Sequence, residues 1–181
     1  MPVLDALTRA AAGALTAGVA LLGLGPTWSR VDALIARAFP DVRWIAPQEL
    51  ASRLEDSRQP PPLLLDARTE AEFAVSHLPG ARRVDPDGDP AAALAAVDPA
   101  RPIVAYCAVG YRSARVASRL QAAGHRDVRN LRGAIFRWAE EGRPLERDGR
   151  PATGVHPYDA YWGRLLRPDL HATSPGARRD R

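Results

Sequence analysis

The stretch from residue 102 to residue 124 places the only cysteine of the chain between a strand and a helix. A short apolar run, Ile-Val-Ala-Tyr at residues 103–106, predicts a strand buried inside a sheet. Apolar residues then recur at helical spacing from Ala114 onward, and Gly124 ends the pattern. Cys107 therefore opens a tight turn, in which the thiol faces the free N–H groups at the start of a helix.

Further apolar runs of strand length alternate with helical patterns along the chain. Continuous apolar runs such as Leu-Leu-Leu at residues 63–65 are typical of strands covered on both faces. The alternation predicts an α/β fold, with a parallel sheet of about five short strands and helices on both faces. Ligands of such sheets bind beyond the carboxyl ends of the strands, where Cys107 is expected. Strands are expected near residues 44–45, 63–65, 82–84, 103–106 and 128–131, and helices near 30–39, 47–54, 69–75, 91–97, 114–123 and 134–142.

The composition argues against several classes of protein. All 25 basic residues are arginines, and they are scattered among 21 acidic residues rather than clustered in a stripe, so no nucleic-acid partner is expected. A single cysteine excludes an internal disulfide framework. The four histidines have no ligand spacing, so we expect neither a metal nor a cofactor.

The chain divides into three parts: residues 1–43, a central domain at 44–145, and a tail at 146–181. The uncharged run within residues 3–25 is shorter than the ~20 residues that span a bilayer comfortably. Three alternatives fit it: a signal peptide, a helix resting on a membrane, and an ordinary packed helix. We expect a cytoplasmic protein, associated with a membrane if the second alternative holds and exported if the first does.

The tail carries aromatic and leucine residues at the spacing i, i+3, i+4, i+7 and i+8, which predicts a short amphipathic helix. Its apolar stripe would pack on the surface of the domain, or alternatively bind a protein partner. The residues are Tyr158, Tyr161, Trp162, Leu165 and Leu166. Residues 171–181 are polar and basic, and we expect them to be disordered.

The residues after Cys107 predict a site for an anion. Gly110 lets the turn adopt a positive φ and curl its amides inward. Arg112 adds a permanent cation with two donors in a fixed fork, and Ser113 is placed to cap the following helix. The N–H groups and the positive end of the helix dipole would stabilise a thiolate or a bound oxyanion.

Three segments in matching order, at residues 66–81, 107–113 and 131–142, resemble the rhodanese superfamily, and the resemblance covers about residues 44–144. It implies a sulfurtransferase in which Cys107 takes sulfane sulfur from a small donor as a persulfide and passes it to a thiol or another thiophilic acceptor. It also implies that the substrate and the persulfide bind in the loop formed by Ala108, Val109, Gly110, Tyr111 and Arg112.

Asp66, Arg68 and His77 match framework positions of the family motif, and with Ser113 they are expected to support the site. The sequence departs from the family at two positions. Ser76 replaces the glycine that commonly precedes the histidine, and Ala108 replaces the basic residue that many thiosulfate-using members carry. Thiosulfate is therefore an uncertain donor. Tyr111, at the rim, would either contact a larger donor or partner, or shield the pocket.

Two other functions share this cysteine loop. A phosphatase or arsenate reductase of the related cell-cycle phosphatase type has five residues between cysteine and arginine, whereas only four intervene here, so the shorter loop suits sulfur better than phosphate. A non-catalytic rhodanese-like binding module or a persulfide carrier is the third alternative. Non-catalytic modules typically lose the cysteine, which this chain keeps.

Overall fold

The computed structural model describes residues 25–173. The alternatives for residues 3–25 and the expected disorder of residues 174–181 therefore fall almost wholly outside the described residues. Within residues 25–173, no helix combines the length and the hydropathy needed to cross a membrane.

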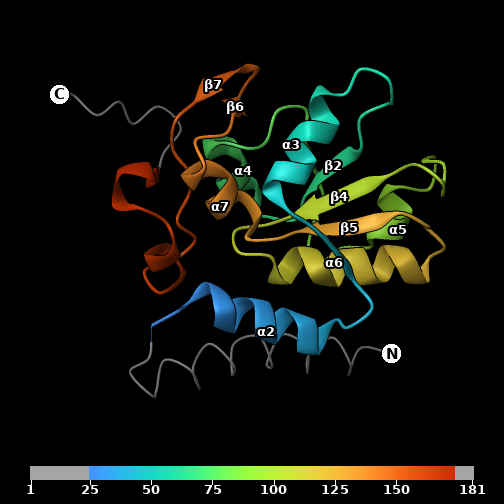
Figure 1. The fold of residues 1–181 in the computed structure, drawn as a ribbon, viewed down its shortest axis with the longest axis horizontal. Coiled ribbons are helices and arrows are strands. Elements are labelled where there is room, and N and C mark those ends of the chain that lie inside the picture. Colours follow the sequence, from blue (N-terminus) through green and yellow to red (C-terminus); the bar gives the residue numbers. More distant parts are fainter. Residues whose placement is uncertain (1–24, 174–181) are drawn as a thin grey trace.

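Five strands form one parallel sheet, as the alternating pattern predicts (Figure 1). The spatial order is β1-β5-β4-β2-β3, so β4 lies in the middle between β5 and β2. Every residue of β4 is buried, because strands flank it on both sides and helices cover both faces of the sheet. The strands are β1 (Arg43–Ile45), β2 (Leu63–Asp66), β3 (Arg82–Arg83), β4 (Ile103–Tyr106) and β5 (Val128–Leu131).

Helices cover both faces of the sheet, which confirms the predicted fold class. In Figure 1, α6 lies directly under the sheet with α2 outside it, while α3 and α7 lie on the opposite side. The helix predicted at residues 91–97 is only one turn long. The helices are α2 (Trp28–Ala38), α3 (Pro47–Glu55), α4 (Glu70–Val75), α5 (Pro90–Ala93), α6 (Tyr111–Ala122) and α7 (Ala134–Glu140).

A two-stranded antiparallel hairpin, β6 (Leu145–Arg147) and β7 (Arg150–Ala152), follows the last helix. It turns through Asp148 and Gly149, both of which have positive φ, as a tight two-residue hairpin loop requires. The hairpin is joined to the domain by a backbone bridge between His77 and Glu146. The sequence pattern does not predict this hairpin.

The predicted amphipathic helix in the tail is wrong. One short 3-10 turn, η1 (Trp162–Leu165), lies within these residues, and a second, η2 (Pro168–Leu170), follows them. Tyr158 precedes both turns and has a φ of +67°. Leu165 and Leu166 are nevertheless buried in the same hydrophobic cluster as the sheet. The two leucines of the stripe therefore pack on the chain's own core, although no α-helix forms.

The expectation of disorder is wrong for the first residues of the 171–181 stretch. His171 forms a backbone bridge with Val155, and its Nε2 lies 3.1 Å from the carbonyl oxygen of Gly163 and 3.0 Å from that of Leu166. One imidazole thus holds the two turns of the tail together.

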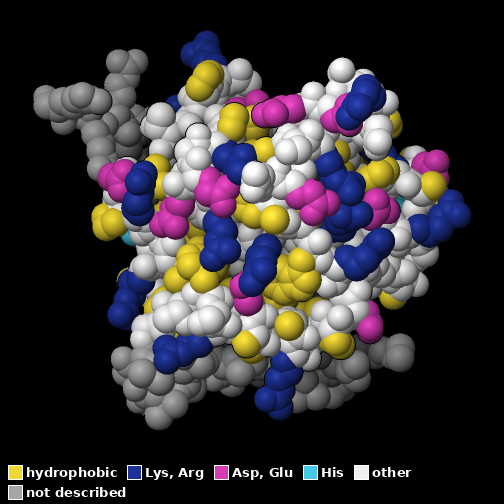
Figure 2. Space-filling view, in the orientation of Figure 1, with side chains coloured by type: hydrophobic (Ala, Val, Ile, Leu, Met, Phe, Trp, Pro, Cys, Tyr) yellow, Lys and Arg dark blue, Asp and Glu magenta, His cyan; other side chains and the backbone are white. Residues whose placement is uncertain are grey.

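Charged side chains of both signs are mixed on the visible face of the molecule. Figure 2 shows arginines lying between aspartates and glutamates over the middle of this face. Several are paired, as in the contacts of Arg129 with Glu49 and Asp127, at 2.9 and 3.2 Å.

Candidate active site

Cys107 follows the last residue of β4 and is buried, with 1% of its surface exposed. Its Sγ accepts a hydrogen bond from the backbone N–H of Gly110, with an N···S distance of 3.1 Å. Ala108 and Val109 between them are also buried. The loop therefore curls back on itself so that an amide points at the sulfur, as the sequence analysis expected of this turn.

Gly110 is the residue before α6 and has a φ of +113°, in the left-handed region that favours glycine. A Cβ at this position would lie 3.2 Å from Cδ1 of Ile35 in α2 and 3.6 Å from Nδ2 of Asn130. Both the conformation and the close packing therefore require glycine, which explains how the loop can turn its amide inward.

The start of α7 holds the loop from the other side. The N–H of Ile135 donates to the carbonyl of Cys107 at 3.1 Å, and the N–H of Phe136 donates to that of Ala108 at 3.3 Å. Gly133, the residue before α7, has a φ of +73° that sets up these two bonds. The carbonyls of Cys107 and Ala108 are therefore bonded to α7, while the N–H of Gly110 points at the sulfur.

Arg112 lies in the first turn of α6, and both terminal nitrogens of its guanidinium group already donate to a carboxylate. Its Nη1 and Nη2 donate to Oε2 and Oε1 of Glu72, at 2.8 and 2.7 Å. Glu72 also accepts from the N–H and the hydroxyl of Thr69, which forms a capping box at the start of α4. The expectation that the fork would face a bound anion is thus not met: both ends of it contact Glu72.

The pair of Glu72 and Arg112 shifts both groups toward the charged state. Burial by itself would raise the pKa of Glu72, but the hydrogen bonds and charge of Arg112, with those from Thr69, lower it to about 2. Burial would lower the pKa of Arg112, but its bonds to Glu72 and the nearby Cys107 raise it above its ordinary value. Glu72 therefore lies among the site residues, a place that the sequence does not indicate.

Ser113 does not cap α6, which is a correction. It lies inside the helix, and its hydroxyl donates to Oδ1 of Asn130 at 2.7 Å, while Nδ2 of Asn130 donates to the carbonyl of Gly110 at 3.0 Å. All of these groups are buried. Ser113 therefore supports the loop through Asn130, which the sequence analysis missed. The available signal was Asn130, an uncharged polar residue in a strand expected to lie inside the sheet.

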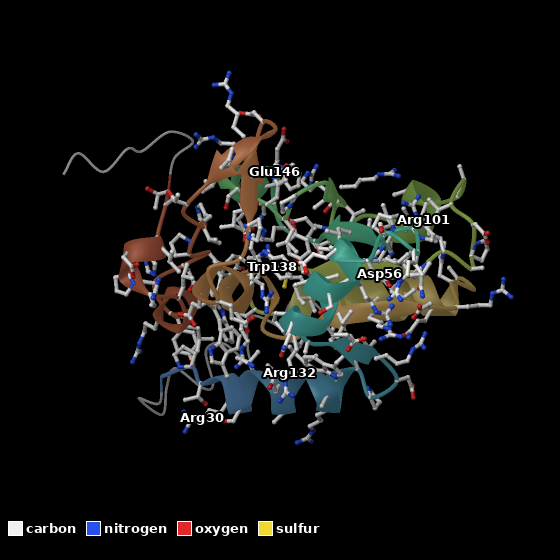
Figure 3. All side chains as sticks on the ribbon, turned by 45° about the horizontal axis from the view of Figure 1, so that its top comes forward. Arg30, Asp56, Arg101, Arg132, Trp138 and Glu146 are labelled. Carbon is white, nitrogen blue, oxygen red and sulfur yellow. The ribbon has the colours of Figure 1, made fainter. Side chains whose placement is uncertain are left out.

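Tyr111 is packed against the N-terminal helix. Its ring meets that of Phe39 edge-on, with the centroids 5.3 Å apart. The helix α2 is fixed in place by the ion pair of Asp32 with Arg132, at 2.8 Å, and Figure 3 shows Arg132 beside this helix. Of the two roles considered for Tyr111, this contact favours shielding over contact with a partner.

The three framework residues lie beside the site. Asp66 and Arg68 form a fully buried ion pair at 2.6 Å, and Nη2 of Arg68 also donates to the carbonyl of Ser76. Burial would lower the pKa of Arg68, but the charge and hydrogen bonds of Asp66 raise it. The His77 ring stacks on Phe73, with the centroids 3.8 Å apart. These contacts fix the carboxyl end of β2 and the turn after α4.

The described residues include no group of three or more His, Cys, Asp and Glu side chains that could hold a metal ion. The chemical groups of the site are therefore a thiol, the loop amides, and a cation paired with a carboxylate. Such a site can hold a nucleophilic sulfur and stabilise negative charge on it.

Comparisons with known proteins agree with this geometry. The family model "Rhodanese-like domain" matches residues 46–141. A protein named "Sulfurtransferase" from Allochromatium vinosum is 35% identical over 104 residues, which is 58% of this chain and 94% of the relative.

Two solved structures extend the likeness to the fold. A rhodanese-like domain protein from Staphylococcus aureus superimposes with a TM-score of 0.51 at 30% identity, over 59% of this chain and 99% of that one. The Alr3790 protein from Anabaena sp. gives a TM-score of 0.53 at 26% identity, over 57% and 91%. Since the family model spans more than half of the chain, this protein belongs to the rhodanese-like domain family.

Proposed function

We propose that this protein is a sulfurtransferase that carries sulfane sulfur as a persulfide on Cys107. The observation that supports it most is the hydrogen bond from the N–H of Gly110 to Sγ of Cys107, at 3.1 Å. An amide donor at this position stabilises the negative charge of the Cys107 thiolate, which attacks the donor. It also stabilises the negative charge of the persulfide that forms on Cys107. The relative named "Sulfurtransferase" supports the same conclusion.

The reaction takes place in two displacements. The thiolate of Cys107 attacks the terminal sulfur of the donor, the S–S bond of the donor breaks, and its electron pair leaves with the rest of the donor. Cys107 then carries a persulfide anion. The thiolate of an acceptor attacks the outer sulfur, and the bond to Cys107 breaks to restore the thiolate. Atoms and charge balance without an oxidant or a reductant.

The paired state of Arg112 favours this function over the phosphatase alternative. A tetrahedral oxyanion needs the fork of the loop arginine, whereas here both ends of the fork are bonded to Glu72. A single sulfur atom needs only the amides of the loop. The four-residue spacing between Cys107 and Arg112 points in the same direction.

Mass spectrometry of the intact protein tests the proposal. After incubation with a sulfane donor, Cys107 should gain the mass of one sulfur atom, and a thiol reductant should remove it. The matched control is Cys107→Ser, which differs by one atom and should gain nothing. Absence of the added sulfur in the wild-type protein would refute the proposal, and hydrolysis of an aryl phosphate would favour the phosphatase.

The carrier alternative is distinguished by turnover. An enzyme should transfer sulfur repeatedly from thiosulfate to cyanide, or from another donor to a thiol, and Cys107→Ser should abolish this transfer. A carrier should accept one sulfur on Cys107 and release it only to a dedicated partner. Turnover that survives the substitution would show that the site has been misassigned.

A further inference from the structure

Tyr158 lies against the active-site arginine, although it comes from outside the matched domain at residues 46–141. The guanidinium carbon of Arg112 is 4.8 Å from the centroid of the Tyr158 ring. Tyr158 is 45% exposed, and among the described residues it is the one large hydrophobic side chain classed as exposed. One side of the ring therefore meets the cation while much of the rest is open to solvent.

The backbone holds Tyr158 in this position at a cost in conformational energy. Its φ of +67° is unfavourable for a residue with a side chain, and its N–H donates to Nδ1 of His156 at 3.1 Å. A strained conformation persists only where the surrounding structure enforces it. The position of the ring is therefore built into this segment.

The segment that carries Tyr158 is tied to the domain on both sides of it. Before it, the hydroxyl of Ser76 donates to the carbonyl of Gly154 at 2.6 Å. After it, the N–H of Arg167 donates to Glu140 of α7 at 3.0 Å. Ser76 is the residue that departs from the family pattern, and its contact with this added segment accounts for the departure. In Figure 1 the segment lies at the end of the molecule to which the β4 arrow points.

The groups around Arg112 restrict the access of a free anion to its guanidinium and offset its positive charge. Glu72 takes the fork, Tyr158 covers a face, and only 19% of the arginine side chain is exposed. Ala108 supplies no second cation in the loop. A small dianion such as thiosulfate would gain little electrostatic attraction here, whereas an organic donor could contact the open part of the Tyr158 ring.

We propose that Tyr158 is a specificity-determining residue that selects organic thiosulfonates, which carry one negative charge and an apolar group, over inorganic thiosulfate. The proposal rests on the sulfurtransferase function proposed above. In the step concerned, the thiolate of Cys107 attacks the terminal sulfur of the thiosulfonate. The S–S bond of the donor breaks, the sulfinate leaves with the electron pair, and the persulfide forms on Cys107.

Donor selectivity of three full-length proteins tests the proposal. Wild type, Tyr158→Ala and Tyr158→Phe are compared by kcat/KM for benzenethiosulfonate and for thiosulfate, with thermal melting to verify the fold. Tyr158→Ala should shift the ratio toward thiosulfate by about fivefold, mainly through KM, because the face of Arg112 is uncovered. Tyr158→Phe keeps the ring and should retain the wild-type ratio. An unchanged ratio in Tyr158→Ala, or an equal shift in Tyr158→Phe, would overturn the proposal.

A second measurement is independent of sulfur transfer. Cys107 is the only cysteine, so its alkylation by iodoacetate and by neutral iodoacetamide reports on charge selection at this one site. Tyr158→Ala should raise the ratio of the iodoacetate rate to the iodoacetamide rate, again by about fivefold, while Tyr158→Phe should not. If no donor loads the wild-type protein, the proposed function fails, while the alkylation ratio still decides whether Tyr158 screens Arg112. An unchanged ratio would overturn the screening.

Discussion

Arg112 donates two hydrogen bonds to Glu72, from a position 40 residues later in the sequence, with N···O distances of 2.8 and 2.7 Å. Because Glu72 also completes the capping box of α4, one carboxylate joins the starts of α4 and α6. Both side chains are largely buried: 3% of the Glu72 side chain and 19% of the Arg112 side chain are exposed. The stability of the loop that carries Cys107 therefore depends on the charge of Glu72.

Glu72→Gln should destabilise the protein in a pH-dependent way. The pKa of Glu72 falls from 4.5 to about 2 on folding, so the carboxylate contributes stability above about pH 4.5 and loses it as the pH falls toward 2. At pH 7 the substitution should lower the free energy of unfolding by about 3 kcal/mol, because it leaves Arg112 without its counter-charge. Urea unfolding at several pH values between 7 and 2 measures both effects.

Glu141→Gln is the control for this prediction. Glu141 pairs with Arg143 but is 37% exposed, and the change should cost about 0.5 kcal/mol or less. The difference in stability between wild type and Glu72→Gln should shrink below pH 4.5. A difference that stays constant down to pH 2 would contradict the assigned pairing.

Gly110→Ala should impair persulfide formation as well as stability. The φ of +113° strains any side chain, and the new Cβ would meet Ile35 at 3.2 Å, so the N–H that donates to Cys107 would move. We expect a loss of about 1–2 kcal/mol from the backbone alone. Gly124→Ala is a matched control, since its φ is +98° and nothing lies within 4 Å of the added Cβ. Equal loading of sulfur by both variants would argue against the amide's role.

Ser113→Ala should lower the free energy of unfolding by about 1–2 kcal/mol. The substitution removes the hydroxyl that donates to Asn130 and leaves a buried acceptor without this partner. Chemical denaturation measures the loss. Ser52→Ala, which removes a hydroxyl bonded to Gln48 on the exposed side of α3, should change stability by less than about 0.5 kcal/mol. Equal effects at the two serines would mean that the buried network adds nothing.

Phe39 and Tyr111 should be energetically coupled. Their rings meet edge-on at 5.3 Å, a geometry worth about 0.5–1.5 kcal/mol beyond buried area. A double-mutant cycle with Phe39→Leu and Tyr111→Leu, followed by urea unfolding, measures the coupling. Additive effects on the free energy of unfolding would show that the contact between Phe39 and Tyr111 does not stabilise the packing of α2 on the loop.

The fold was predictable because its signals are local. Leu63 to Leu65 and residues 103–106 are continuous apolar runs, and short helical patterns separate them, so a parallel sheet covered on both faces follows directly. The left-handed turn at Gly110 also follows from the residue type. The helix expected at residues 91–97 ends at Ala93, because alanine favours helix without supplying an apolar face to pack.

The partners of the site residues were not predictable, because they come from distant parts of the chain. Nothing in the sequence shows that Glu72 pairs with Arg112, or that Asn130 contacts Ser113. The apolar spacing from Tyr158 to Leu166 fits an α-helix as well as it fits the observed structure, in which a short 3-10 turn brings Leu165 and Leu166 to the core. The tertiary contacts of Tyr158 and Leu165 determine which structure forms. These contacts cannot be derived from the spacing of apolar residues in the sequence.

The burial of a single cysteine also fixes the order of events in any sulfur transfer. Cys107 has no second thiol anywhere in the chain to resolve its persulfide, and it is 1% exposed. Two substrates cannot reach one enclosed sulfur together, so the first product must depart before the acceptor enters. The proposed enzyme should therefore follow ping-pong kinetics, with parallel lines in double-reciprocal plots. Between the two half-reactions, the sulfur is stored on Cys107 inside the protein, as a covalent intermediate that remains after the first product has left.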